Sequence, residues 1–267
     1  MQRRAFLNVL VTGLTAAWIL PAREVKAALA AMSTTWNKPA FDATKMQNAL
    51  QALAITGEIK SDDIQLIAPD KAENGAIVQI EVTSSIPNTE AIYVLVEHNP
   101  TALIGQYAFK NGAQPFFITR IKMAETSDIK VIVKAGTQFY TASKKVEVLE
   151  NGCGGGGSAN EKFETSMKLR AKLTTDVTEV KAIIIHPMHT GRGKADNGEL
   201  IPAHFIQTVT VSLNEKPVLE MQLGTGISKN PYLTFKLAGA TVGDKITVSC
   251  ADNLGLSATQ SIEVIQA

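Results

Sequence analysis

The chain has 267 residues, and its 26 Lys and Arg residues nearly balance its 25 Asp and Glu residues. A formal net charge of +1 argues against the strongly basic surface that nucleic-acid binding uses, so we expect no nucleic-acid partner. The length suits two small domains, each able to bury its own core. Aromatic residues make up only 6%, and frequent glycine suits short strands joined by tight turns.

The N-terminus has the pattern of a twin-arginine export signal. Arg3 and Arg4 precede an apolar stretch, Val9 to Leu20, that is shorter than the ~20 residues a membrane-spanning helix needs. Small residues near position 30 suit cleavage, with the mature chain starting near Ala31. We therefore expect residues 1–30 to direct export to the periplasm and the mature protein to have no membrane segment. An uncleaved membrane anchor is the alternative.

The first mature segment predicts a short helix followed by strands. Apolar residues at spacings of three to five predict an amphipathic helix over Asp42 to Ala54, capped by Asp42 or Thr44 and stopped by Gly57. From Asp63 onward, short apolar runs alternate with turn residues, which is typical of a β-sandwich. The predicted strands are Ile64–Ala68, Ala76–Val82, Ala91–Val96, Ile104–Phe109, Gln114–Ile121, Ser127–Lys134 and Gln138–Leu149.

The second half of the chain repeats this pattern. Its predicted strands are Lys168–Leu173, Glu179–His186, His204–Leu213, Lys216–Leu223, Tyr232–Leu237, Lys245–Ala251 and Ser257–Gln266. We therefore predict an all-β protein of two tandem immunoglobulin-like β-sandwiches, the first preceded by a short helix. The predicted domains are residues 31–150 and 165–267, joined by an arm over residues 151–164.

The arm contains a thiol between glycines. Cys153 is flanked by Gly152 and by Gly154, Gly155, Gly156 and Gly157, and glycine permits backbone conformations of both signs of φ, so this segment is predicted to be flexible. A chain of about 11 residues spans roughly 18 Å root-mean-square, so the arm has slack although it is tethered at both ends. A solvated arm does nothing to activate the thiol, which suits a carrier better than an enzyme. A simple linker with an incidental cysteine is the alternative.

The remaining candidates for chemistry point to structural roles. Cys250 lies in an alternating strand pattern and is predicted to be buried, so a disulfide to Cys153 is not expected. His186, His189 and His204 suggest a metal site, but Pro187 interrupts their spacing and no carboxylate cluster is visible beside them. We therefore expect no metal and no cofactor, and no catalytic residues.

Several motifs resemble the two subunits of a bacterial sulfur carrier. The first domain, ending in Asn151-Gly152-Cys153-Gly154-Gly155, is similar to SoxY, whose signature is a terminal Gly-Gly-Cys-Gly-Gly. Here Asn151 replaces the first glycine, and the cysteine is internal. The second domain resembles SoxZ in Ile185–Gly191, Ile201–Ile206, Gly226–Leu233 and Asp252–Gly255. The resemblance covers essentially the whole mature chain and indicates a SoxY–SoxZ fusion.

The resemblance implies a carrier for thiosulfate and sulfur oxidation, with substrate attached to Cys153. It implies three partners: a c-type cytochrome enzyme that conjugates thiosulfate, a hydrolase that releases sulfate, and a sulfane dehydrogenase. It also implies an intramolecular interface between the two domains, which should therefore pack together. Two alternatives stay open: a related carrier that accompanies a quinoprotein dehydrogenase, and a non-catalytic binding module whose glycine run is only a linker.

Overall fold

The structure, a computed structural model, describes residues 35–152 and 166–267. The predicted twin-arginine signal, Cys153 and most of the arm lie outside the described residues. Trp36 to Ala267 form one compact unit. No helix in the described part of the chain is long and apolar enough to cross a membrane.

Two short helices are present, and only the second lies within the helix predicted over Asp42 to Ala54. They are α2 (Lys38–Phe41) and α3 (Met46–Ala52). Asn37 caps α2, because its side chain accepts a hydrogen bond from the Ala40 N–H. The prediction that Asp42 or Thr44 caps the helix is wrong: Asp42 follows the end of α2, and the residue before α3 is Lys45, whose side chain makes no capping bond.

The first sheet contains strands from both halves of the chain. In the described residues its order is β1-β9-β8-β5-β6-β13-β12-β15-β16, and β3 also pairs with β9. The strands are β1 (Ile59–Lys60), β3 (Lys71–Asn74), β5 (Thr89–Val96), β6 (Leu103–Phe109), β8 (Ser127–Ala135), β9 (Gln138–Glu150), β12 (Ile206–Leu213), β13 (Lys216–Leu223), β15 (Lys245–Asp252) and β16 (Ser257–Glu263).

The second sheet packs against the first and has the order β17-β10-β11-β14-β7-β4-β2. Its strands are β2 (Ile64–Ile67), β4 (Val78–Ser84), β7 (Ala113–Ile121), β10 (Ser166–Leu173), β11 (Val177–Ile185), β14 (Tyr232–Ala238) and β17 (Ile265–Gln266). Every strand predicted from the sequence is present within a few residues, which confirms the all-β fold. The run predicted as one strand over Ser257 to Gln266 is divided at buried Val264 into β16 and β17.

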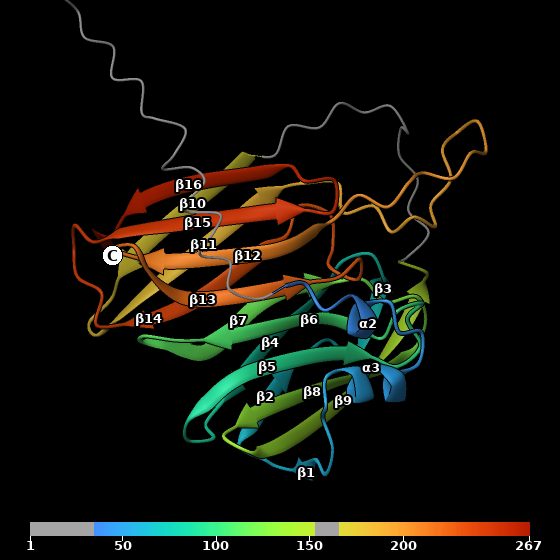
Figure 1. The fold of residues 1–267 in the computed structure, drawn as a ribbon, viewed down its shortest axis with the longest axis horizontal. Helices are drawn as coiled ribbons and strands as arrows, with labels where there is room; N and C mark the ends of the chain where they lie inside the picture. The colour runs from blue at the N-terminus through green and yellow to red at the C-terminus, as the bar shows by residue number, and fades with distance from the viewer. Residues whose placement is uncertain (1–34, 153–165) are drawn as a thin grey trace, which may run out of the picture. The chain divides into compact units, whose positions relative to one another are not determined.

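Both sheets run without interruption from the first sandwich into the second, as Figure 1 shows for β6 beside β13 and β7 beside β14. Strand β6 pairs antiparallel with β13, from Phe109 opposite Leu219 to Gly105 opposite Leu223. In the other sheet β7 pairs antiparallel with β14. Each half thus covers the strand edges of the other, which would otherwise expose unpaired backbone groups. The predicted packing of the two sandwiches is confirmed, in the form of shared sheets.

The hydrophobic core is also shared. One cluster of buried residues extends from Ile80 in β4 to Val248 in β15, with no break at the seam between the sandwiches. Tyr107 and Phe117, whose ring centroids lie 3.9 Å apart, stack at the strands that form the seam. The two halves are therefore packed together as a single body.

Candidate functional site: the root of the cysteine arm

Strand β9 carries the chain to the start of the arm. It ends at Glu150, and Gly152 is the last residue described before Cys153. The predicted attachment residue Cys153 and the residues predicted to be flexible, Gly154–Gly157, lie outside the described residues. The described part of the site is the root of the arm, by which we mean Gly152 and the residues that contact it.

A chain of backbone hydrogen bonds holds this root. The Gly75 N–H donates to the Glu150 carbonyl at 2.8 Å, the Met123 N–H donates to the Gly75 carbonyl at 2.7 Å, and the Gly152 N–H donates to the Met123 carbonyl at 3.0 Å. Gly152 is buried. The sequence places Gly152 in the flexible arm, whereas in the structure it is a fixed point from which the arm leaves.

Gly152 and Gly75 cross so closely that neither position has room for a side chain. A Cβ added at Gly152 would lie 1.9 Å from the Gly75 carbonyl carbon, and a Cβ added at Gly75 would lie 2.3 Å from the Met123 carbonyl oxygen. Atoms that are not bonded to one another do not approach this closely. The glycine before the cysteine is therefore required by the packing at this crossing.

The second sandwich touches the same root. The Ser228 hydroxyl donates to the carbonyl of Ala76, the neighbour of Gly75, at 2.7 Å. The Lys122 N–H, one residue before Met123, donates to the Gly226 carbonyl at 2.6 Å. The arm is thus anchored where strands of both halves meet.

Lys122 adds a buried cation to this junction. Its side chain is only 7% exposed, and its Nζ donates to the carbonyl of Met188 and, at 3.0 Å, to that of Thr225. Because a buried ammonium is costly without acceptors, these two carbonyls fix how the loops that carry them sit against the first sandwich. Sequence patterns gave no sign of Lys122, because nothing local distinguishes it from a surface lysine.

Two of the three predicted histidines lie beside the carboxylate of Asp252, which is distant from both in the sequence. His204 Nε2 lies 2.8 Å from Asp252 Oδ2, and His186 Nε2 lies 3.5 Å from the same oxygen. The expectation that no carboxylate lies beside these histidines is therefore wrong. His189 lies outside this cluster of ligand atoms, and its backbone pairs with that of His204.

The His186–Asp252–His204 cluster is suited by its residue types to hold a metal, but one hydrogen bond opposes this. The Met188 N–H donates to His186 Nδ1 at 3.1 Å, so Nδ1 is the unprotonated nitrogen. A metal on Nε2 requires the proton on Nδ1, where it would face the Met188 N–H donor to donor. We interpret the cluster as a hydrogen-bonded network that joins the loop before β12 to the turn after β15.

The electrostatics of this network agree with that interpretation. Burial, the largest cause, lowers the pKa of His186 to about 4; the charge of the nearby His204 lowers it too, whereas the hydrogen bond and charge of Asp252 raise it. Burial alone would raise the pKa of Asp252, but hydrogen bonds from His204 and from the Leu256 and Leu254 N–H groups outweigh it and lower the pKa. The stable arrangement is a neutral His186 beside an ionised Asp252.

This network predicts a loss of stability in acid. Because the folded pKa of His186 is about 4 and lies below its unfolded value of about 6.5, its contribution is complete above pH 6.5 and is lost as pH falls toward 4. At about 1.4 kcal/mol per pKa unit, the loss is on the order of 3 kcal/mol. Urea unfolding of wild type and His186→Gln between pH 7 and pH 4 measures it. We expect the free energy of unfolding to depend less on pH in His186→Gln than in wild type. In His98→Gln, which alters an exposed histidine, it should depend on pH as in wild type. Equal slopes in all three would contradict the assignment.

The two halves of the chain match two known protein families. The family described as "Sulfur oxidation protein SoxY" matches residues 50–153, so the match ends on Cys153 itself. The family described as "Sulphur oxidation protein SoxZ" matches residues 167–263. The chain is a SoxY–SoxZ fusion. The seam described above is then the interface between its SoxY and SoxZ parts, and the chain is by family a sulfur-oxidation carrier.

Two solved structures show similarity to parts of the fusion. The sulfur carrier protein SoxY from Chlorobium limicola f thiosulfatophilum is 32% identical, with 43% of this chain and 100% of that chain covered and a TM-score of 0.37. A β-glycosidase from Bacteroides vulgatus is 10% identical, with 82% of this chain and 26% of that chain covered and a TM-score of 0.25. No curated sequence matched.

The second cysteine of the fusion lies in the SoxZ core. Cys250 in β15 is only 2% exposed and is a free thiol, which confirms the prediction of a buried side chain. Burial raises the pKa of its thiol to about 11, so almost no thiolate is present at neutral pH. Cys250 is therefore chemically quiet.

The burial of Cys250 predicts that alkylation of the native protein is selective for Cys153. With iodoacetamide at neutral pH, native protein should take up one label, and peptide mapping should place it on Cys153. After unfolding in urea the protein should take up two labels. Cys250→Ala should show one label in both states, which serves as the control. Rapid labelling of Cys250 in the native protein would contradict its burial.

Proposed function

We propose that the SoxY–SoxZ fusion is a covalent carrier of sulfur intermediates, with its cargo on Cys153. The observation that carries the proposal is that the SoxY match ends on Cys153, directly after a root that is clamped by both halves of the protein. A fixed root and a glycine-rich continuation present one thiol at a defined place while its flanks add no bulk.

Attachment requires partners because it is an oxidation. Joining the Cys153 sulfur to the outer sulfur of thiosulfate forms an S–S bond, releases the thiol proton and removes two electrons. The c-type cytochrome partner implied by the family would accept these electrons. A hydrolase would then add water and release sulfate, leaving a persulfide for the sulfane dehydrogenase. We infer that the carrier presents the thiol and that these enzymes supply the activation.

Mass spectrometry of the intact protein tests the proposal. After incubation with thiosulfate and the three partner enzymes, we expect sulfur-containing adducts whose peptide maps to Cys153. The adducts should disappear on reduction, because the attachment is a disulfide-type bond. Cys250→Ala should load like wild type. A thiol at Cys153 that stays unmodified under all of these conditions would sink the proposal.

The proposed location is the periplasm, and it rests on the twin-arginine pattern at Arg3 and Arg4. Replacing both arginines by lysine should leave the protein in the cytoplasm with residues 1–30 still attached. Fractionation of cells and the intact mass of each fraction measure this. Unchanged export of the double variant would contradict the proposed route.

A further inference from the structure

The outer face of the second sheet carries an unbalanced set of positive charges. Strands β10, β11, β14 and β7 contain six cations and a single acid, Glu179. The cations alternate along their strands with buried residues such as Ala171, Val180 and Phe235, so their side chains point away from the core. We call these six residues the basic face: Lys168, Arg170, Lys172, Lys181, Lys236 and Arg120.

The register of the strands brings like charges together on this face. Arg170 in β10 lies directly opposite Lys181 in β11, and like charges in such positions destabilise a sheet. The hydrogen bond and charge of Glu179 raise the pKa of Lys181, whereas the charge of Arg170 opposes that shift. Within the described residues, Lys181 is the one member of the basic face with an ion pair, to Glu179 at 3.0 Å. Folding therefore gains little from most of these charges, which suits a role in binding.

Aromatic rings hold two of the cations at the seam. The guanidinium carbon of Arg120 lies 4.9 Å from the ring centroid of Tyr232, and the Nζ atom of Lys236 lies 4.0 Å from that of Phe116. Each contact joins the SoxY strand β7 to the SoxZ strand β14, which pair with one another. The basic face is therefore continuous across the seam, and these two side chains lose less freedom when a partner binds.

The basic face reaches the end of the sheet at which the root of the arm lies. Arg120 is near the end of β7 and shortly precedes Met123, whose carbonyl accepts the hydrogen bond from the Gly152 N–H. Lys168 is near the start of β10, where the described chain resumes after the arm. Because β7 and β10 run in opposite directions, these two positions lie at the same end of the sheet. A protein that receives Cys153 approaches beside this face.

The charge of the face indicates the chemistry of its partner. The formal net charge of the whole chain is only +1, so the excess of cations is a property of this face and not of the molecule. Surfaces of opposite potential attract one another and fix their relative orientation. An anionic membrane is also negative, but a membrane does not receive a thiol, and the position beside the root favours a protein.

We propose that the basic face is a docking surface for an acidic patch on the enzymes that receive Cys153. The face steers the encounter and sets the orientation in which the carrier meets each enzyme. The proposal rests on the carrier function proposed above, but it uses the charges of the sheet and no chemistry at the thiol. Docking and loading are therefore measured separately.

Binding kinetics of the full chain with Cys153→Ser test the docking surface, because this variant excludes covalent capture. Surface plasmon resonance with each of the three partner enzymes measures the association rate. For at least one enzyme we expect the rate to fall steeply as ionic strength rises, because salt screens attraction between charged surfaces. Adding Arg170→Glu together with Lys181→Glu should slow association by about tenfold or more at low ionic strength.

Arg170→Glu alone separates binding from folding. It places a negative charge opposite Lys181 in place of a positive one, so the variant should unfold at a temperature no lower than wild type. Its association with the enzyme should nevertheless be slower. A variant that folds at least as well and docks more slowly shows that the charge acts in binding.

The matched control for the double variant is Lys216→Glu with Lys245→Glu. Both lysines are exposed at the ends of strands in the first sheet, and neither is in an ion pair within the described residues. This control changes the total charge by the same amount and should associate at the wild-type rate.

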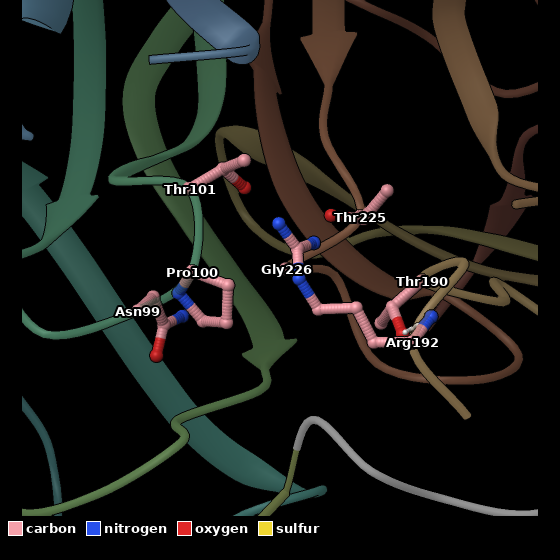
Figure 2. A pocket seen from close by; sticks show the side chains of 7 residues that line it. All are labelled: Asn99, Pro100, Thr101, Thr190, Arg192, Thr225 and Gly226. Atoms are coloured by element: carbon pink, nitrogen blue, oxygen red, sulfur yellow. Dashed lines mark hydrogen bonds between the residues drawn. The ribbon is translucent and has the colours of Figure 1, made fainter. Parts of the chain in front are cut away.

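Arg192 provides a second comparison, because it is the other described arginine of the SoxZ part. Figure 2 shows it in the lining of a small pocket between loops at the seam, together with Thr101 and Thr225. It is exposed like Arg170 but does not lie in the basic face. Arg192→Glu should therefore slow association less than Arg170→Glu does.

Several outcomes would overturn the docking surface. These are equal slowing by the two double variants, a larger effect of Arg192→Glu than of Arg170→Glu, and binding that does not respond to salt. Salt-sensitive binding to phosphatidylglycerol vesicles but to none of the enzymes would also overturn it, because it would assign the face to a membrane. Loading of Cys153 without any effect of the basic face would refute the docking surface alone, and salt-sensitive docking without loading would refute the carrier chemistry alone.

Discussion

Replacing Cys153 by serine should reduce thiosulfate-dependent turnover to the background of a reaction without carrier. The substitution changes one atom, so the fold and the root of the arm should be unaffected. A serine hydroxyl cannot form the sulfur–sulfur bond that attaches thiosulfate, and no second thiol can replace it, because Cys250 is buried in β15. The measurement is electron transfer to cytochrome in a system reconstituted from the partner enzymes.

The control for this result is the other cysteine. Cys250→Ala also removes a thiol, and it should retain turnover once its stability has been checked by urea unfolding. Wild-type turnover in Cys153→Ser would refute the carrier proposal and favour the linker interpretation of the glycine run. Loss of turnover in both variants would show that the substitutions act through the fold and would refute the assignment to Cys153.

Most of the strands were predictable because each buries a face of at least several residues. The alternation in β4, with every second residue buried from Val78 to Ser84, is visible in the sequence alone. The missed strands β1 and β3 have two and four residues and one buried side chain at most, so their pattern cannot be distinguished from a loop. The helix pattern also misled, because one apolar period spans two helices that are separated by extended Lys45.

The seam and the sites on it were not predictable from local patterns. The apolar patterns of β6 and β7 predict that each is a strand. Nothing in these patterns indicates that β6 pairs with β13 or β7 with β14. The same holds for Asp252 and His204, which are distant in sequence and meet only because β12 pairs with β15. Even the motif Asp252–Gly255, which carried part of the SoxZ resemblance, gave no sign that its carboxylate binds a histidine. Contacts of this kind follow from topology, and sequence periodicity describes only the element itself.

The root of the arm makes the second large prediction: Gly152→Ala should destabilise the whole protein, although it adds only one methyl group at the start of the glycine run. Its Cβ would lie 1.9 Å from the Gly75 carbonyl carbon, in contact with backbone that cannot rotate away. Either the Met123–Gly152 hydrogen bond breaks or β9 shifts. We expect a loss of at least about 2 kcal/mol in the free energy of unfolding and a Tm lower by roughly 4–8 °C.

The matched control is Gly155→Ala, which adds the same methyl group further along the glycine run and should change stability by less than about 0.5 kcal/mol. The crossing itself is tested by combining Gly75→Ala with Gly152→Ala. Because each substitution alone should force the two backbones apart, the second should cost less than the first, and the double variant should be more stable than the sum of the single effects predicts. Additive losses would mean that the two glycines act independently, which the geometry excludes. A Gly152→Ala variant as stable as Gly155→Ala would mean that Gly152 is not held in place. The hydrogen bonds at the root of the arm indicate that it is.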